Sequence, residues 1–213
     1  IVQFMTKDQG RIVGVARGVR GTQRRVNSIQ PFNVGTLSYF GRNNLVNVAK
    51  FDAAHGFNLR GDVLFGGFYV LELLSRLIAE RQKEPEIFAG AVSALTAMEA
   101  GHELQAVLRC FELDLLGQLG YEVVFDQDAE EGRAIAPDVY YRYQAQVGFT
   151  KVLQGREIES DPTVVQGRWL QCIWRRDFDQ PEARRAAKYI TRQALQGLLG
   201  DKPLISRKML GSR

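Results

Sequence analysis

The sequence predicts an α+β protein in which a small β-barrel precedes a mainly α-helical domain. Residues 1–52 alternate apolar and polar side chains in short runs separated by turn residues, a pattern typical of β-strands. From about Leu59 onward the apolar side chains recur with the period of helices. Of the 213 residues, 45% are hydrophobic, which is enough to form packed cores. We therefore expect a barrel domain over residues 1–55 and a helical domain over residues 56–213.

Four strands are expected in the barrel domain. They are IVQFMT (1–6), RIVGVARG (11–18), FNVGTLSYFG (32–41) and NNLVNVAKFD (43–52). Gly14 interrupts the second strand, where we expect a β-bulge. Short strands of this kind suit a barrel of the OB type, which has five strands. Because the chain begins within a strand pattern and without a methionine, we expect the first barrel strand to precede residue 1.

Three helices are expected to open the helical domain, and three more to close it after a non-helical excursion at residues 121–152. The expected helices are 63–83, 86–100, 103–119, 162–174, 181–199 and 203–210. Gly101 and Gly120 follow the second and third helices, as glycines at helix ends commonly do. Gly66 and Gly67 weaken the first helix, so we expect it to pack closely against another backbone there. The excursion contains YYRYQAQVGF, whose alternation is typical of a β-hairpin.

Positive charge is concentrated toward the N-terminus. Residues 1–60 have a net charge of +7, residues 61–150 one of −9 and residues 151–213 one of +6. The segment ARGVRGTQRR interleaves arginines, which suit phosphate oxygens, with glycines, which let the backbone approach closely. We expect this surface to bind nucleic acid rather than merely to aid solubility. The candidate binding residues are Arg11, Arg17, Arg20, Arg24, Arg25 and Arg42.

Two adjacent aromatic residues, Tyr39 and Phe40, lie on an expected strand of the barrel domain. An exposed aromatic ring can stack on a nucleobase, whereas a buried one fills the barrel core. Both interpretations are open for Tyr39, and the core is favoured for Phe40. Tyr39 therefore joins the candidate nucleic-acid-binding residues.

A second basic cluster lies near the C-terminus. Arg184, Lys188 and Arg192 are spaced by four residues and share one face of an expected helix. Such a stripe is most often a solvated face. Beside Trp169 and Trp174, it can also bind an acidic peptide or extend a nucleic-acid track.

The sequence predicts neither an enzyme nor a cofactor or metal site. The acidic residues of the run DQDAEE (126–131) lack the glycine and glutamate spacing of an EF-hand, which favours a solvated acidic turn. The two cysteines and two histidines are scattered, which disfavours zinc. No glycine-rich phosphate-binding motif is present. Without a signal peptide or an apolar run near the ~18 residues that cross a bilayer, a cytoplasmic protein is expected.

Six stretches of the chain carry a family resemblance. They are GRIVGVARGVRGTQRR, QPFNVGTLSYFGRNNL, LRGDVLFGGFYVLELLSRL, LRCFELDLLGQLGYEVVFD, PDVYYRY and GDKPLISRKML. In this order they resemble the RecO family of bacterial recombination mediators over nearly the whole chain. The resemblance implies an OB barrel joined to a helical domain, with the arginines of ARGVRGTQRR in the basic loop of the barrel. The cysteines that hold zinc in some members are missing between Tyr121 and Tyr143, so we expect a zinc-less excursion.

The resemblance also implies a function and partners. It implies binding of single- and double-stranded DNA, annealing of complementary strands, and cooperation with RecR to load RecA onto DNA coated by single-stranded-DNA-binding protein, at the nucleoid. The tail of the single-stranded-DNA-binding protein is acidic with an apolar tip, which suits a basic pocket in the helical domain. The candidate residues for this peptide are Arg109, Arg142, Arg184, Lys188 and Arg192. The alternative is a protein-interaction adaptor that binds acidic peptides and contacts DNA only incidentally. A metal-dependent nuclease has only the acidic run in its favour.

Overall fold

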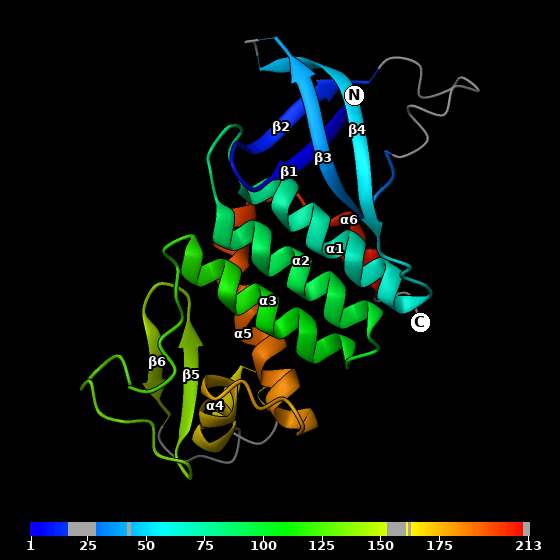
Figure 1. Ribbon diagram of the computed structural model, residues 1–213. Coiled ribbons are helices and arrows are strands. Elements are labelled where there is room, and N and C mark those ends of the chain that lie inside the picture. The colour runs from blue at the N-terminus through cyan, green and yellow to red at the C-terminus, as the bar shows by residue number, and fades with distance from the viewer. Residues whose placement is uncertain (17–28, 42–43, 153–160, 162, 211–213) are drawn as a thin grey trace. The chain divides into compact units, whose positions relative to one another are not determined.

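The computed structural model describes residues 1–16, 29–41, 44–152, 161 and 163–210. The chain forms two compact units, one of residues Ile1–Leu104 with Pro203–Arg213 and one of Gln105–Lys202 (Figure 1). Each unit combines a small antiparallel or mixed sheet with helices, which confirms the predicted α+β class. The two compact units group residues that lie close together in space. The expected boundary near residue 55 instead marks where the period of the apolar side chains changes along the sequence. That boundary stays a prediction.

The first unit contains a four-stranded sheet and three helices within the described residues. Its elements are β1 (Val2–Thr6), β2 (Gly10–Val15), β3 (Asn33–Phe40), β4 (Leu45–Gly56), α1 (Asp62–Leu77), α2 (Pro85–Glu99) and α6 (Ile205–Leu210). The strand order is β1-β2-β4-β3, with β2 and β4 parallel and the other two pairs antiparallel. The four strands confirm the sequence prediction. Among the described strands β1 and β3 form the sheet edges, and closure into a barrel stays a prediction.

Gly14 does not form the expected bulge, because it pairs in regular register with Val2 on β1 and Val46 on β4. A Cβ atom at this position would lie 2.8 Å from Cγ2 of Val48, so close packing accounts for the glycine. The irregularities lie instead between β3 and β4, at Val34/Gly35 and Ser38/Tyr39, where β4 contributes an extra residue.

Helix α1 ends at Leu77, six residues before the expected end of the first helix. The chain that follows is extended and lies against β2, where the Arg81 amide donates to the carbonyl of Arg11. This contact with a distant strand overrides a local pattern that favours helix. The expected close packing at the two glycines of α1 is confirmed, but their neighbours are side chains rather than backbone. A Cβ atom on Gly67 would lie 2.6 Å from Leu59 and 2.8 Å from the Phe32 ring.

The C-terminal helix α6 is fastened to α1 through one carboxylate. Glu72 of α1 accepts the backbone N–H groups of Ile205 and Ser206, both at 2.9 Å, and the Ser206 hydroxyl. These N–H groups open a helix and have no partner inside it. Burial acts to raise the pKa of Glu72, but the hydrogen bonds from Ser206 and Ile205 outweigh it and hold the pKa below its ordinary value. The Arg207 guanidinium adds a contact above the ring of Tyr69 on α1.

The second unit contains a three-stranded antiparallel sheet of order β6-β5-β7 and three helices within the described residues. Its elements are α3 (Leu104–Gln118), β5 (Tyr140–Gln144), β6 (Gly148–Lys151), β7 (Val164–Gln166), α4 (Gly167–Trp174) and α5 (Pro181–Leu199). The core gathers fully buried side chains from the sheet and helices, such as Tyr141, Phe149, Leu170 and Ile190. The β5–β6 pair confirms the predicted hairpin.

Strand β7 was not expected, since its residues were assigned to a helix over 162–174. Three residues are too few to display a strand period. Gly167 follows the strand directly and begins α4, and its amide donates to the Val139 carbonyl at 2.8 Å. A Cβ atom on Gly167 would lie 2.0 Å from the carbonyl oxygen of Ala136, so only glycine permits this approach.

Candidate nucleic-acid and peptide interfaces

Most of the predicted DNA-binding arginines belong to segments outside the described residues. They are Arg17, Arg20, Arg24, Arg25 and Arg42. The strand ends that precede these segments in the sequence lie at the same end of the sheet. Val15, the last residue of β2, pairs with Asn47 on β4, and Asn47 pairs with Phe40, the last residue of β3. The binding role of these arginines stays a prediction.

Arg11 lies on β2, and its guanidinium is already engaged within the first unit. Its Nε–H donates to the Ile78 carbonyl at 2.9 Å, and Nη1 lies 3.5 Å from a carboxylate oxygen of Glu80. Only 16% of the side chain is exposed. Arg11 therefore tethers β2 to the segment after α1 and offers little surface to a phosphate in this conformation.

The exposed aromatic ring at the end of β3 is Phe40 rather than Tyr39. Phe40 is 61% exposed, which makes its expected place in the core wrong, and Tyr39 is half-buried. The alternation of side chains between the two faces of β3 could have predicted this exposure. Phe40 shares a face with Thr36 and Ser38, whereas Tyr39 shares one with Leu37. A face with two polar residues is the solvent face.

In the second unit, a buried ion pair joins α3 to α5. Arg109 Nη2 donates to Glu112 Oε1 at 2.8 Å, and the other carboxylate oxygen accepts the hydroxyl of Thr191 on α5. The side chains of Arg109 and Glu112 are 4% and 1% exposed. Nε and Nη1 of Arg109 are also buried and have no hydrogen-bond partner among the described residues. The i, i+3 spacing of the two charges inside an apolar helix pattern is visible in the sequence, although their burial is not.

Two further cations on α5 extend this pair into a basic cluster. Burial lowers the pKa of the half-buried Lys188, and the charges of Arg192 and Arg109 lower it further. The charges of Arg192, Arg109 and the buried Glu112 thus all act on Lys188. We call Arg109, Glu112, Lys188 and Arg192 the α3–α5 cluster. An anion entering it would be attracted by the surplus positive charge.

The other two predicted peptide-binding residues lie elsewhere in the second unit. Arg142 on β5 forms an ion pair of 2.9 Å with Asp161 and a longer hydrogen bond to the Thr163 hydroxyl. Arg184 donates through Nη1 to the carbonyls of Phe178 and Asp179, the turn that precedes α5. Of the five candidates, the structure thus brings together Arg109, Lys188 and Arg192.

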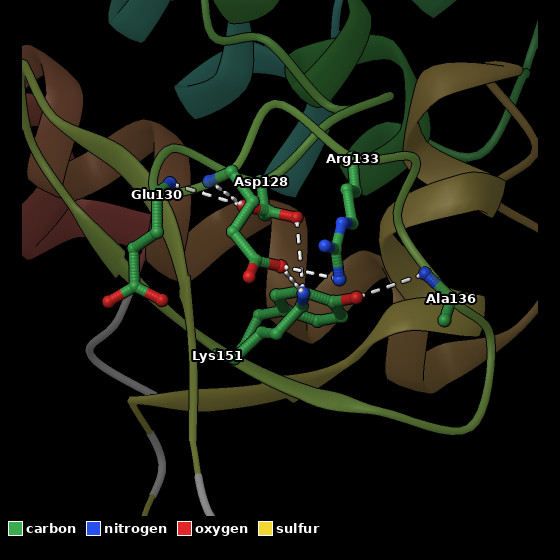
Figure 2. A network of polar contacts seen from close by, with 7 residues as sticks. Asp128, Glu130, Arg133, Ala136 and Lys151 are labelled. Carbon is green, nitrogen blue, oxygen red and sulfur yellow. Dashed lines mark hydrogen bonds and ion pairs between the residues drawn. The ribbon is translucent and has the colours of Figure 1, made fainter.

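In the acidic run after α3, Asp126, Glu130 and Glu131 are exposed, as expected of a solvated turn, whereas Asp128 is buried in a polar network (Figure 2). Asp128 is 2% exposed, and its Oδ1 accepts the backbone N–H groups of Glu130 and Glu131. The hydrogen bond from Glu131 is the main cause that lowers the pKa of Asp128, against the effect of burial. The Lys151 ammonium lies 2.7 Å from Glu131 and 3.5 Å from Asp128, so one protein cation is paired with two carboxylates of the run. Arg133 adds a second cation at 3.1 Å from Glu131.

The described residues form no group of three or more His, Cys, Asp or Glu side chains that could hold a metal ion. Both cysteines are free thiols and partly buried, and burial raises the pKa of each. Within the same residues, no helix is long and apolar enough to cross a membrane.

Comparison with known proteins identifies the family. The model described as Recombination protein O N terminal matches residues 1–57, and the model described as Recombination protein O C terminal matches residues 59–208. The chain belongs to the RecO family. Among curated RecO relatives, the DNA repair protein RecO of Pseudomonas paraeruginosa is 38% identical over 100% of this chain and 88% of its own length. The DNA repair protein RecO of Actinobacillus succinogenes is 36% identical over 98% of this chain and 87% of its own.

The RecO relative from Haemophilus influenzae is also named DNA repair protein RecO, and it is 35% identical over 98% of this chain. Family models that together cover both compact units confirm the resemblance predicted from the six sequence stretches. The chain is therefore a RecO-family DNA repair protein.

Proposed function

We propose that this protein is a non-enzymatic recombination mediator that binds single- and double-stranded DNA and anneals complementary strands. It would help RecR load RecA onto DNA coated by single-stranded-DNA-binding protein, and would act at the nucleoid in the cytoplasm. Membership of the RecO family and the net charge of +7 over residues 1–60 support this proposal. Annealing requires no bond to be made or broken. It requires a surface that reduces the repulsion between two phosphate chains and leaves the base edges free.

The basic residues of the N-terminal segment suit this task because their contacts with phosphate do not depend on base sequence. Each arginine that neutralises a phosphate releases condensed counterions, so affinity falls steeply as salt rises. We expect a variant with Arg17, Arg20, Arg24 and Arg25 changed to Ala to bind DNA more weakly and with a shallower salt dependence. Each lost phosphate contact should reduce the slope of log K against log salt by about 0.7–0.9.

The measurement is a salt titration of a labelled oligonucleotide by fluorescence anisotropy, followed by annealing of complementary strands coated with single-stranded-DNA-binding protein. Arg185→Ala is the matched control, since this exposed arginine is paired with Glu182 on the surface of α5. An unchanged affinity and salt slope in the four-arginine variant would contradict the role of this segment. Magnesium-dependent strand cleavage by the pure protein would contradict the non-enzymatic proposal.

The α3–α5 cluster supports a site for the acidic tail of the single-stranded-DNA-binding protein. The observation that carries this site is the pair of buried Arg109 N–H groups without a hydrogen-bond partner among the described residues. A carboxylate that reached them would complete the guanidinium's hydrogen bonds and offset the surplus charge. A carboxylate beside Lys188 would also act against the lowering of its pKa and favour the ammonium form. Arg142 and Arg184 would contribute at most from the surrounding surface, since both already have partners.

Anisotropy of a labelled acidic tail peptide tests this site. We expect binding at micromolar concentrations that weakens in Lys188→Ala and in Arg192→Ala, while Arg185→Ala serves as the exposed control on the same helix. Absence of binding at tens of micromolar would rule the site out. Peptide binding together with no measurable DNA binding would favour the alternative, an adaptor that contacts DNA only incidentally.

A further inference from the structure

The carboxyl end of α4 presents an exposed tryptophan followed by two arginines. Trp174 is 56% exposed, although Ile173 beside it is fully buried in the core of the second unit. Arg175 is exposed, and its guanidinium forms no ion pair within the described residues. The stretch GRWLQCIWRR, which contains the whole helix, has three arginines and no acidic residue.

A strained turn fixes this tryptophan at the surface. Arg176 adopts a left-handed conformation with φ of 58°, which costs a residue with a side chain about 1–2 kcal/mol. Its amide donates to the Ile173 carbonyl at 3.0 Å, and the next amide, of Asp177, donates to the Cys172 carbonyl at 2.9 Å. This pattern ends a helix sharply, and glycine commonly occupies the left-handed position. The Arg176 guanidinium holds the turn in place through a 2.7 Å ion pair with Asp114 of α3.

We propose that Trp174 stacks on an unpaired base of single-stranded nucleic acid while Arg175 contacts a neighbouring phosphate. The inference rests on the proposed function and deepens it. It gives the second unit its own contact with a nucleic-acid strand, at residues far in sequence from the N-terminal arginines. An annealing protein must engage two strands, and a second contact of this kind would hold one of them with its bases unpaired.

Charge and exposure favour a nucleic acid over an apolar protein partner. An apolar partner would have to desolvate the arginines that follow Trp174 in the sequence, whereas a nucleic acid can bind the ring and a guanidinium together. The two remaining arginines of the stretch GRWLQCIWRR are in exposed ion pairs, Arg168 with Asp138 and Arg176 with Asp114. An exposed pair such as Arg168–Asp138 contributes little to stability, so the Arg168 guanidinium can exchange its carboxylate for a phosphate.

The protein contains two tryptophans, which gives a direct spectroscopic test. In the full chain with Trp169→Phe, Trp174 becomes the sole tryptophan, and titration with an oligo(dT) of about 15 nucleotides should quench its emission saturably. The complementary Trp174→Phe protein retains Trp169, which is half-buried, and should show little quenching. Anisotropy of the labelled oligonucleotide is recorded on the same samples, so that binding and stacking are measured separately.

Affinity measurements complete the test. Trp174→Ala should weaken binding of oligo(dT) about 5- to 150-fold, and Trp174→Phe should retain most of it, because a phenyl ring still stacks. A blunt duplex offers no unpaired base, so Trp174→Ala should change duplex affinity less than about twofold. Arg175→Ala should weaken binding of both, with a smaller salt slope.

Two outcomes separate this inference from the proposed function. If the oligonucleotide binds while the emission of Trp174 and the affinity of Trp174→Ala stay unchanged, the stacking inference is wrong and DNA binding stands. If the unmodified protein binds no oligonucleotide, the proposed function fails and the inference fails with it.

Discussion

The buried ion pair between Arg109 and Glu112 makes the stability of the second unit sensitive to a single charge. In Glu112→Gln the side chain keeps its shape but loses its negative charge. The Arg109 guanidinium, 4% exposed and already without partners at Nε and Nη1, then has no compensating charge in the pair. Removing one partner of a buried pair costs about 3–5 kcal/mol, because the remaining charge stays out of water. The hydrogen bond to the Thr191 hydroxyl also weakens, since its acceptor is no longer charged.

Urea unfolding followed by circular dichroism measures this loss. With a slope of about 2 kcal/mol per molar, a loss of 4 kcal/mol lowers the midpoint by about 2 M. Glu182→Gln is the matched control, because Glu182 and Arg185 have the same i, i+3 spacing on an exposed surface of α5. Such a surface pair contributes at most about 1 kcal/mol. If the two variants unfold at the same urea concentration, burial does not increase the cost of removing one charge from the Arg109–Glu112 pair.

A second variant separates the cost of an unpaired charge from the value of the pair. Replacing both residues, as Arg109→Met with Glu112→Leu, removes both charges and keeps an apolar volume in the core. Substitutions of this kind at buried ion pairs are often neutral or stabilising. We therefore expect the double variant to be more stable than Glu112→Gln. A double variant as unstable as the single one would show that packing, rather than charge, sets the cost.

Three further predictions concern the first unit and the polar network of Figure 2. Glu72→Ala should lower the protection factors of the first amides of α6 against hydrogen exchange about five- to tenfold. Because the folded pKa of Glu72 is lowered, its contribution is present at neutral pH and is lost as the pH falls through that pKa, so acidification should lower the same protection factors in the unmodified protein. Gly67→Ala should destabilise the protein by about 1–3 kcal/mol in urea unfolding, whereas Gly90→Ala, with open space at its Cβ position in α2, should stabilise it by up to about 1 kcal/mol. Asp128→Asn should speed proteolysis between residues 126 and 136 measurably more than Asp126→Asn does. Of these two residues, only Asp128 is buried and accepts the backbone N–H groups of the loop through its side chain. Equal cleavage rates would contradict this anchoring role.

The fold class and most elements follow from local pattern, and the misses have physical causes. Periods of two and 3.6 residues locate the four strands of the first sheet, the β5–β6 hairpin and most of the helices. The end of α1 was misplaced because Arg11, 67 residues away, binds the Ile78 carbonyl and favours extended chain there. Strand β7 was missed because three residues do not establish a period, and its pairing with β5 depends on the close approach at Gly167.

The candidate sites show a sharper limit, since a sequence shows where cations are but not what they already bind. Arg184, Lys188 and Arg192 look equivalent on a helical wheel. The first donates to backbone carbonyls in the turn before α5, whereas Lys188 interacts with the buried pair on α3 and with Arg192. Only tertiary structure distinguishes a structural guanidinium from one in a cluster with surplus charge.

The same limit applies to exposed aromatic rings, and it decides where a base can stack. Trp174 follows a buried isoleucine at the end of a helix, and whether its ring faces the core depends on where α4 ends. The left-handed Arg176 ends the helix at this point, and Asp114 on another helix holds its side chain. Arg176→Gly keeps the backbone conformation and removes the ion pair, whereas Asp114→Ala removes the pair and keeps the strain. Each variant also changes the charge, and the change in its affinity for the blunt duplex measures that effect. If the turn serves to present the ring, Asp114→Ala should weaken oligo(dT) binding more than Arg176→Gly does once this effect of charge is subtracted. Equal losses would show that Arg176 acts as a cation alone.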